Sequence, residues 1–175
     1  SFKKDDALLD IKGFSGPEEF ANNFPFVPYQ FIIMQKVFAE IRKHGNSGKH
    51  LSGGERSMLS GFQEAVQKLQ EKDEYALVPF FRFYDTVHTF LEGSIRRVIE
   101  RCQKAADNAN GIEAQDVDVL KLLYLIRYID SDIRGTIDNI VILMADDIRA
   151  DKVILREGIK KSLDRLLSQN YIGRS

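Results

Sequence analysis

Apolar residues recur at every third or fourth position over most of the chain, which is the spacing of the buried face of an α-helix. No segment shows the alternation of apolar and polar residues that a half-buried strand requires. The fold class is therefore predicted to be all-α. The periodicity predicts six helices, over residues 28–43, 53–71, 79–105 and 114–128 and beginning near residues 136 and 151.

The third predicted helix has the clearest pattern. Its apolar stripe advances by three and four residues without a miss, through Phe80, Tyr84, Val87, Leu91, Ile95, Val98 and Cys102. One long, continuous helix is therefore expected over this segment. Because the neighbouring Phe80, Phe81 and Phe83 point in different directions around a helix, at least one of them is expected to contact another element or a part of a longer parent protein.

The C-terminal part is predicted to contain three helices and then the first residues of a strand at Tyr171-Ile172, which is the element order of a winged helix. Thr136 is a plausible N-cap of the second of these helices, and the third is expected to start near Asp151 and end at Gln169-Asn170. Tyr171-Ile172 is expected to turn outward. The sequence stops where the wing would begin, so most of the wing is predicted to be missing.

Turn residues at Asp107–Gly111 interrupt the helical pattern and predict a domain boundary. Composition changes near the same place, because all twelve Phe lie between Phe2 and Phe90 and all four Pro lie between Pro17 and Pro79. We expect an irregular segment at 1–23, a helical lid-like domain with a long third helix at 24–106, and a truncated winged-helix-like domain at 112–175.

Composition narrows the class of protein. The chain has 175 residues, of which 43% are hydrophobic and 29% charged, so a packed core is expected and wholesale disorder is excluded. The single cysteine, Cys102, cannot form an internal disulfide, which fits a cytoplasmic protein, and its place on the apolar stripe predicts a buried, inert thiol. No run of about 18 apolar residues indicates a membrane span. Because the chain starts without Met, we expect a fragment of a longer protein.

The net charge of −1 hides a basic C-terminal region. Residues 149–175 contain seven basic and three acidic residues, a local charge of +4. The residues Arg156, Lys160, Lys161 and Arg165 are candidate nucleic-acid contacts, since a basic helix can enter a major groove. The alternative is a solvated helix face with pairs such as Glu157–Lys161. The DNA interpretation predicts a winged-helix module with a helical oligomerisation extension.

The segment Leu51-Ser52-Gly53-Gly54-Glu55-Arg56 allows three interpretations. As a capping box, Ser52 and Glu55 would start a helix. As an ABC-type signature it would need Walker A and Walker B motifs, and the sequence contains neither, since Lys43 occupies the place of the leading glycine of a phosphate loop. In the AAA+ pattern, Arg56 at the start of a lid helix would reach the γ-phosphate, as a guanidinium suits phosphate oxygens.

Other chemistry is not indicated. His44, His50 and His88 are scattered and have no acidic or cysteine partners at metal-binding spacing, so no metal site is predicted. No Ser-His-Asp or Cys-His arrangement is recognisable, and no catalytic residue is assigned.

Several runs together resemble the P-loop ATPases of the BREX phage-defence system, the BrxC or PglY-like family. The resemblance covers nearly the whole chain and rests on Phe24–Phe31, Ile41–Gly45, His50–Ser52, Gly54–Ser57, Val78–Phe80, Phe83–Thr86, Gly93–Glu100, Val119–Leu123 and Ala150–Lys152.

The resemblance implies an internal segment of a large, bacterial, AAA+-like ATPase that binds ATP and Mg elsewhere. Its partners would be the remainder of that ATPase, other BREX proteins and DNA, with no membrane contact. Only Arg56 is implied as a nucleotide contact. Because the sequence has no Walker A or Walker B motif, the segment alone is expected to be a regulatory and interaction unit without ATPase activity.

Overall fold

The computed structural model describes residues 28–44, 77–147 and 149–174, together with Glu18, Ser60, Gly61 and Glu64. These parts are helical and contain no β-strand, which confirms the predicted all-α class. The segment 1–23 and the helix predicted at 53–71 lie outside the described residues, apart from these isolated positions. The elements are α2 (Pro28–His44), η3 (Phe80–Arg82), α4 (Phe83–Val87), η4 (His88–Phe90), α5 (Gly93–Asp107), α6 (Ala114–Arg127), α7 (Ile137–Met144) and α8 (Lys152–Ser168).

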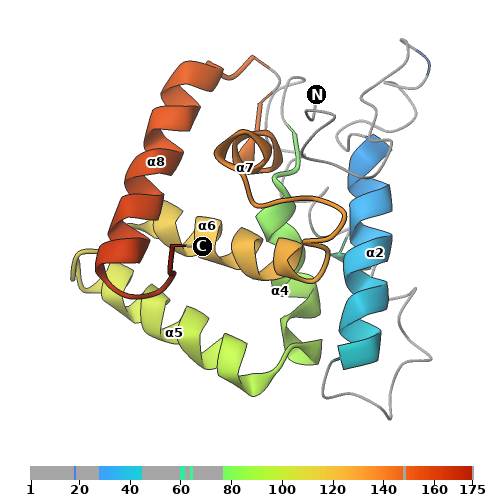
Figure 1. The fold of residues 1–175 in the computed structure, drawn as a ribbon, viewed down its shortest axis with the longest axis horizontal. Coiled ribbons are helices and arrows are strands. Elements are labelled where there is room, and N and C mark those ends of the chain that lie inside the picture. The colour runs from blue at the N-terminus through green and yellow to red at the C-terminus, as the bar shows by residue number, and fades with distance from the viewer. Residues whose placement is uncertain are drawn as a thin grey trace.

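Helix α6 lies at the centre of the arrangement (Figure 1). It packs against α5, α4 and η3 on the N-terminal side of the Asp107–Gly111 turn, and against α7 and α8 on the C-terminal side. Its buried residues are apolar on several faces, which is typical of a helix surrounded by others (Val117, Val119, Leu120, Leu122, Leu125 and Ile126). Apolar residues on both sides of the turn therefore belong to one core. The division into a lid-like and a winged-helix-like domain stays a prediction.

The single long helix predicted over 79–105 is wrong. The structure divides this segment into η3, α4 and η4, followed by a break at Leu91 and Glu92 and then α5. Leu91 is extended, with φ −77° and ψ 157°, and Glu92 is the N-cap of α5. Gly93, which follows, has poor helix propensity and favours an interruption at this point. The apolar stripe nevertheless faces the core, and Leu91 is 1% exposed.

The three phenylalanines of this segment separate as expected. Phe80 and Phe83 are both buried, and their ring centroids lie 5.9 Å apart. The 3₁₀ geometry of η3 allows this, because residues three apart overlap in such a helix. Phe81 is half-buried beneath the Arg82 guanidinium, which lies 5.4 Å from the ring centroid.

Helix ends follow local chemistry. The Thr136 hydroxyl accepts a hydrogen bond from the Asn139 amide, and the Asp151 carboxylate accepts from the amides of Val153 and Ile154, so the predicted starts of α7 and α8 are confirmed. Helix α8 ends in a Schellman motif, in which the Tyr171 amide donates to the Leu166 carbonyl at 2.8 Å.

The C-terminal residues differ from the expectation of a strand. Residues 171–174 are irregular, and Tyr171 and Ile172 pack against the core instead of turning outward. Asn170, with φ 60°, reverses the chain after α8. The Arg101 guanidinium of α5 then covers the Tyr171 ring at 5.2 Å from its centroid.

The turn between α5 and α6 packs against the end of α8. Gly111 has φ +74°, and a Cβ at this position would lie 2.6 Å from the Gln169 Nε2 atom. A side chain at position 111 would therefore meet both an unfavourable backbone conformation and a clash.

Candidate functional site

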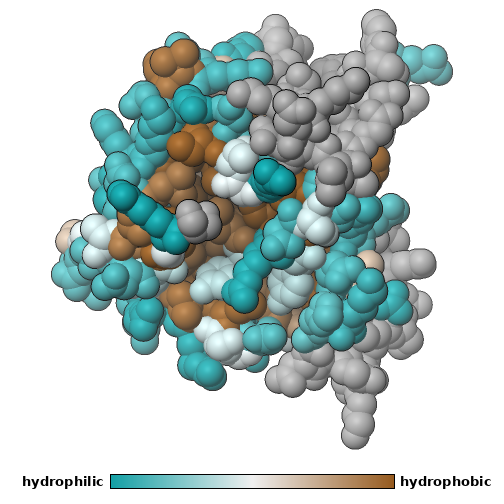
Figure 2. All heavy atoms as spheres, viewed as in Figure 1, coloured by the Kyte–Doolittle hydropathy of each residue, from teal (hydrophilic) through white to brown (hydrophobic). Residues whose placement is uncertain are grey.

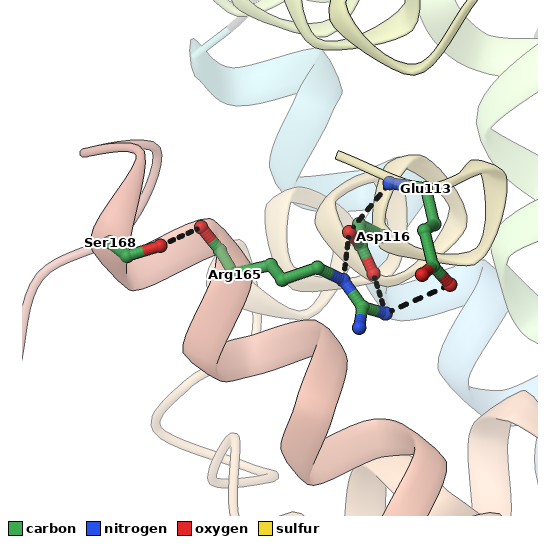
Figure 3. A network of polar contacts seen from close by, with 4 residues as sticks. All are labelled: Glu113, Asp116, Arg165 and Ser168. Atoms are coloured by element: carbon green, nitrogen blue, oxygen red, sulfur yellow. Dashed lines mark hydrogen bonds and ion pairs between the residues drawn. The ribbon is translucent and has the colours of Figure 1, made fainter. Parts of the chain in front are cut away.

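A buried ion pair fixes α8 against α6 (Figure 3). The Asp116 side chain is completely buried, whereas that of Arg165 is 26% exposed. The guanidinium donates two hydrogen bonds to the carboxylate, from Nε to Oδ2 at 2.7 Å and from Nη2 to Oδ1 at 2.8 Å. The Glu113 carboxylate adds a 3.3 Å contact to the same guanidinium. Such two-point pairing fixes geometry more strongly than a single ionic contact does.

Asp116 also stabilises the start of α6. Its carboxylate accepts a hydrogen bond from the Glu113 amide at 2.8 Å, which is one half of a capping box. Burial by itself raises the pKa of the Asp116 carboxyl, but hydrogen bonds from Arg165 and from the Glu113 amide outweigh it and lower the pKa below its usual range. Asp116 is therefore held as an ionised anchor.

The helices that this ion pair holds together enclose an apolar groove. Figure 2 shows it as a hollowed hydrophobic area between α7 and α8, crossed by the C-terminal residues. Its volume is 980 Å³. Its apolar lining comes from three helices and from the C-terminal segment (Leu123, Ile126, Ile137, Ile140, Leu163, Leu167 and Ile172).

Charged residues of both signs surround the apolar lining. Arg127 contributes from the end of α6, Asp130 from the turn after it, Asp164 from α8 and Arg174 from the C-terminal segment. An apolar groove with a charged rim is the surface that an amphipathic helix recognises, because the apolar side chains of the ligand are buried while its polar flanks remain near charge. The described lining is therefore mainly apolar, with charged side chains of both signs around it.

The four basic residues predicted to contact nucleic acid do not form one free surface. Arg156 is paired with Asp138 of α7, and Lys160 with Glu157 at 3.2 Å. Arg165 is engaged with Asp116 as described above. Lys161 is exposed, and in the described part of the chain it forms no ion pair. Three of the four basic residues therefore already have carboxylate partners. Contact of α8 with DNA stays a prediction.

The predicted pair of Glu157 with Lys161 does not form as expected. Glu157 contacts Lys160, three residues away, and not Lys161, four residues away. Both spacings place side chains on neighbouring positions of a helix face, so sequence distance alone does not select between them.

Other predicted sites contribute little to this region. Arg56 and the glycine-containing motif around it lie outside the described residues. His44 lies 3.5 Å from the Glu40 carboxylate, and the His88 Nδ1 atom lies 2.8 Å from the Asp85 carbonyl. In the part of the chain that the structure describes, no three metal-ligating side chains converge, and no helix is long and apolar enough to cross a membrane.

Cys102 is buried in the core, as its position on the apolar stripe predicted. Burial raises the pKa of its thiol to about 11. Since the thiolate is the reactive form, this environment favours an inert cysteine.

The anchor at Glu113 and Asp116 was not predicted from the sequence. A local signal was present, because an acidic residue precedes the helix and another follows three positions later, as in a capping box with acidic side chains. No local signal identifies Arg165 as the partner, since 49 positions separate it from Asp116.

No family model matches the chain, and no solved structure matches it. The groove and the charge distribution therefore carry the functional argument, together with the resemblance described above.

Proposed function

We propose that this chain is a non-catalytic regulatory and interaction segment of a large AAA+-like ATPase of the BrxC family, in a bacterial BREX phage-defence system. The resemblance extends over nearly the whole sequence and supplies the family. In this proposal the N-terminal helices act as a lid-like unit and α6, α7 and α8 as a winged-helix-like unit, in the cytoplasm. ATP and Mg bind to other parts of the ATPase, and Arg56 is the candidate contact with nucleotide.

The single observation that carries the interaction role is the apolar groove between α6, α7 and α8. Leu163 and Leu167 lie four positions apart on α8, so both side chains line one face of that helix. Both are only partly buried, which leaves apolar surface available for a partner. The occupant that fits is an amphipathic helix from the remainder of the same ATPase, whose charged flanks would meet Arg127 and Asp164 on the rim.

The rival function, DNA binding through α8, receives less support. Its basic residues are mostly engaged in ion pairs with Asp138, Glu157 and Asp116, so the positive charge on this helix is largely balanced. An interaction with protein through the adjacent groove requires no such charge.

The groove is tested by Leu167→Glu in the full-length ATPase, expressed in bacteria that carry the remaining BREX genes. A charge in the groove has to be desolvated when the partner helix binds, so binding and phage protection should be lost. The efficiency of phage plating measures the result, and immunoblotting confirms equal protein levels. We expect partner binding to weaken by at least about tenfold, a loss of about 1.4 kcal/mol of binding free energy, and the efficiency of plating to rise as a result.

The matched control is Ile154→Glu, which introduces the same residue on the same helix at a site that is 72% exposed and outside the groove. This variant should protect as well as the wild type. Full protection by Leu167→Glu would refute the groove as an interaction site. A thermal melt of both variants of the 175-residue chain separates lost binding from lost folding.

A further inference from the structure

A second surface, on the solvent side of α5, carries positive charge that the described part of the chain does not balance. The helix contains four basic residues, Arg96, Arg97, Arg101 and Lys104, and two acidic ones. Arg97, Arg101 and Lys104 are exposed. Their spacing of four and then three residues places them in one row along the helix, over a length of about 10 Å.

The charge of α5 differs from that of α8 in how it is compensated. Helix α8 has five basic and two acidic residues of its own, but Asp138 pairs with Arg156, and Asp116 and Glu113 pair with Arg165. None of the four basic residues of α5 forms an ion pair within the described residues. The positive potential at the protein surface is therefore expected to be stronger over α5 than the sequence alone indicated, and weaker over α8.

The row on α5 is rigidly supported. The opposite face of the helix is buried in the core through Ile95, Ile99 and Cys102. The Arg101 guanidinium rests on the Tyr171 ring, which restricts this long side chain. Figure 2 shows hydrophilic side chains along the lower left margin, where α5 lies in Figure 1. A rigid row loses less conformational entropy on binding than a flexible one does.

The like charges of the row disfavour the helix on which they lie. Arg97 and Arg101 stand four positions apart, where two cations repel each other. Glu100 lies three positions after Arg97 and four before Lys104 without forming an ion pair with either among the described residues, and it offsets only part of this charge. A polyanion bound along the helix would relieve the repulsion, and guanidinium groups suit phosphate oxygens in particular.

We propose that the exposed face of α5 binds the sugar-phosphate backbone of duplex DNA without reading its sequence. Duplex is favoured over single-stranded nucleic acid because, among the described residues of the patch, no exposed aromatic ring is present on which bases could stack. Tyr84 is 5% exposed beneath Lys121, whose Nζ atom lies 5.4 Å from the ring centroid, and Tyr171 is covered by Arg101. This site is separate from the groove between α6, α7 and α8, and it does not depend on the function proposed above.

The test measures binding of the 175-residue chain to a fluorescein-labelled duplex of 20 base pairs by fluorescence anisotropy, over a series of salt concentrations. Arg97→Glu/Lys104→Glu should weaken binding at low salt by at least about tenfold. The slope of log K against log salt should fall by about two, because each lost phosphate contact contributes about 0.9 for duplex DNA. Circular dichroism confirms that the variant is folded.

Two further double variants carry the same change in net charge. Arg42→Glu/Lys43→Glu alters exposed residues at the end of α2 and controls for the charge of the whole molecule. Lys160→Glu/Lys161→Glu tests α8 as the competing surface. We expect both to bind DNA within about twofold of the wild type, since among the described helices it is α5 that presents the row of phosphate contacts.

Three outcomes would overturn the proposal. The first is absence of duplex binding by the wild type at low salt. The second is a loss of binding in the α8 variant that equals or exceeds the loss in the α5 variant. The third is displacement of the duplex by poly-glutamate at an equal concentration of charge, which would assign the surface to an acidic protein. None of these three outcomes would affect the phage-plating test of Leu167→Glu, so the DNA proposal and the groove proposal are tested separately.

Discussion

Replacement of Arg165 by Met tests whether the ion pair between α8 and α6 stabilises the fold. Met retains the length and apolar character of the side chain and removes the guanidinium. The Asp116 carboxylate would then be completely buried, with only the Glu113 amide and the buried Ser162 hydroxyl beside it as donors among the described residues. Removal of one partner from a buried pair costs about 3–5 kcal/mol. Because Arg165 is 26% exposed, we expect the lower end, a loss of about 3 kcal/mol in the free energy of unfolding.

Urea denaturation followed by circular dichroism at pH 7 measures this loss. The urea concentration at the midpoint should fall. The slope of the free energy of unfolding against urea concentration should stay unchanged, since the surface exposed on unfolding is nearly the same. Lys161→Met is the matched control, because Lys161 is exposed on the same helix. Its replacement should change the free energy of unfolding by less than about 0.5 kcal/mol.

The pH dependence gives a second, independent test. In the wild type the pKa of Asp116 is lowered, so its stabilising contribution is present above the pKa of the unfolded chain and is lost as pH falls through the folded value. In Arg165→Met the guanidinium no longer lowers this pKa, so the pKa of Asp116 rises relative to the wild type and the variant gains stability relative to the wild type on acidification. The difference in the free energy of unfolding between the wild type and Arg165→Met should therefore narrow below about pH 5. A difference under about 1 kcal/mol at pH 7, or one that is independent of pH, would refute the reasoning.

Three further predictions concern single residues. Ala109 is the left-handed residue of the Schellman motif after α5, with φ 52°, so Ala109→Gly should relieve backbone strain and raise the free energy of unfolding by about 0.5–1 kcal/mol, and a lowered melting temperature would contradict this. Asn170→Gly, at φ 60° after α8, should gain less, because asparagine tolerates this conformation. Cys102 is buried with a pKa raised to about 11, so it should react with Ellman's reagent at pH 8 only after unfolding, and rapid labelling of the folded chain would show that the thiol is accessible.

Local sequence patterns predicted those helix ends that are set by hydrogen bonds between residues close together in the chain. The cap at Thr136 and the start of α8 at Asp151 were both predicted, because a cap depends on groups within a few positions of one another. The inward face of the stripe from Phe80 to Cys102 was also predicted. The break at Leu91 was not, because an apolar stripe keeps its period whether the helix continues or restarts after a short extended link.

The sequence by itself determined that the described chain is all-helical and which faces of its helices are buried, since both depend on periodicity along the chain. Only the tertiary structure decided which charges are neutralised and where apolar surface remains. Arg165 resembles the other cations of α8 until Asp116, 49 positions away, is placed beside it. The row on α5 is distinctive for the opposite reason, because no carboxylate among the described residues is brought to pair with it. These differences arise from contacts between segments that are far apart in the sequence. The periodicity of apolar residues reports only on neighbouring positions, so it does not predict such contacts.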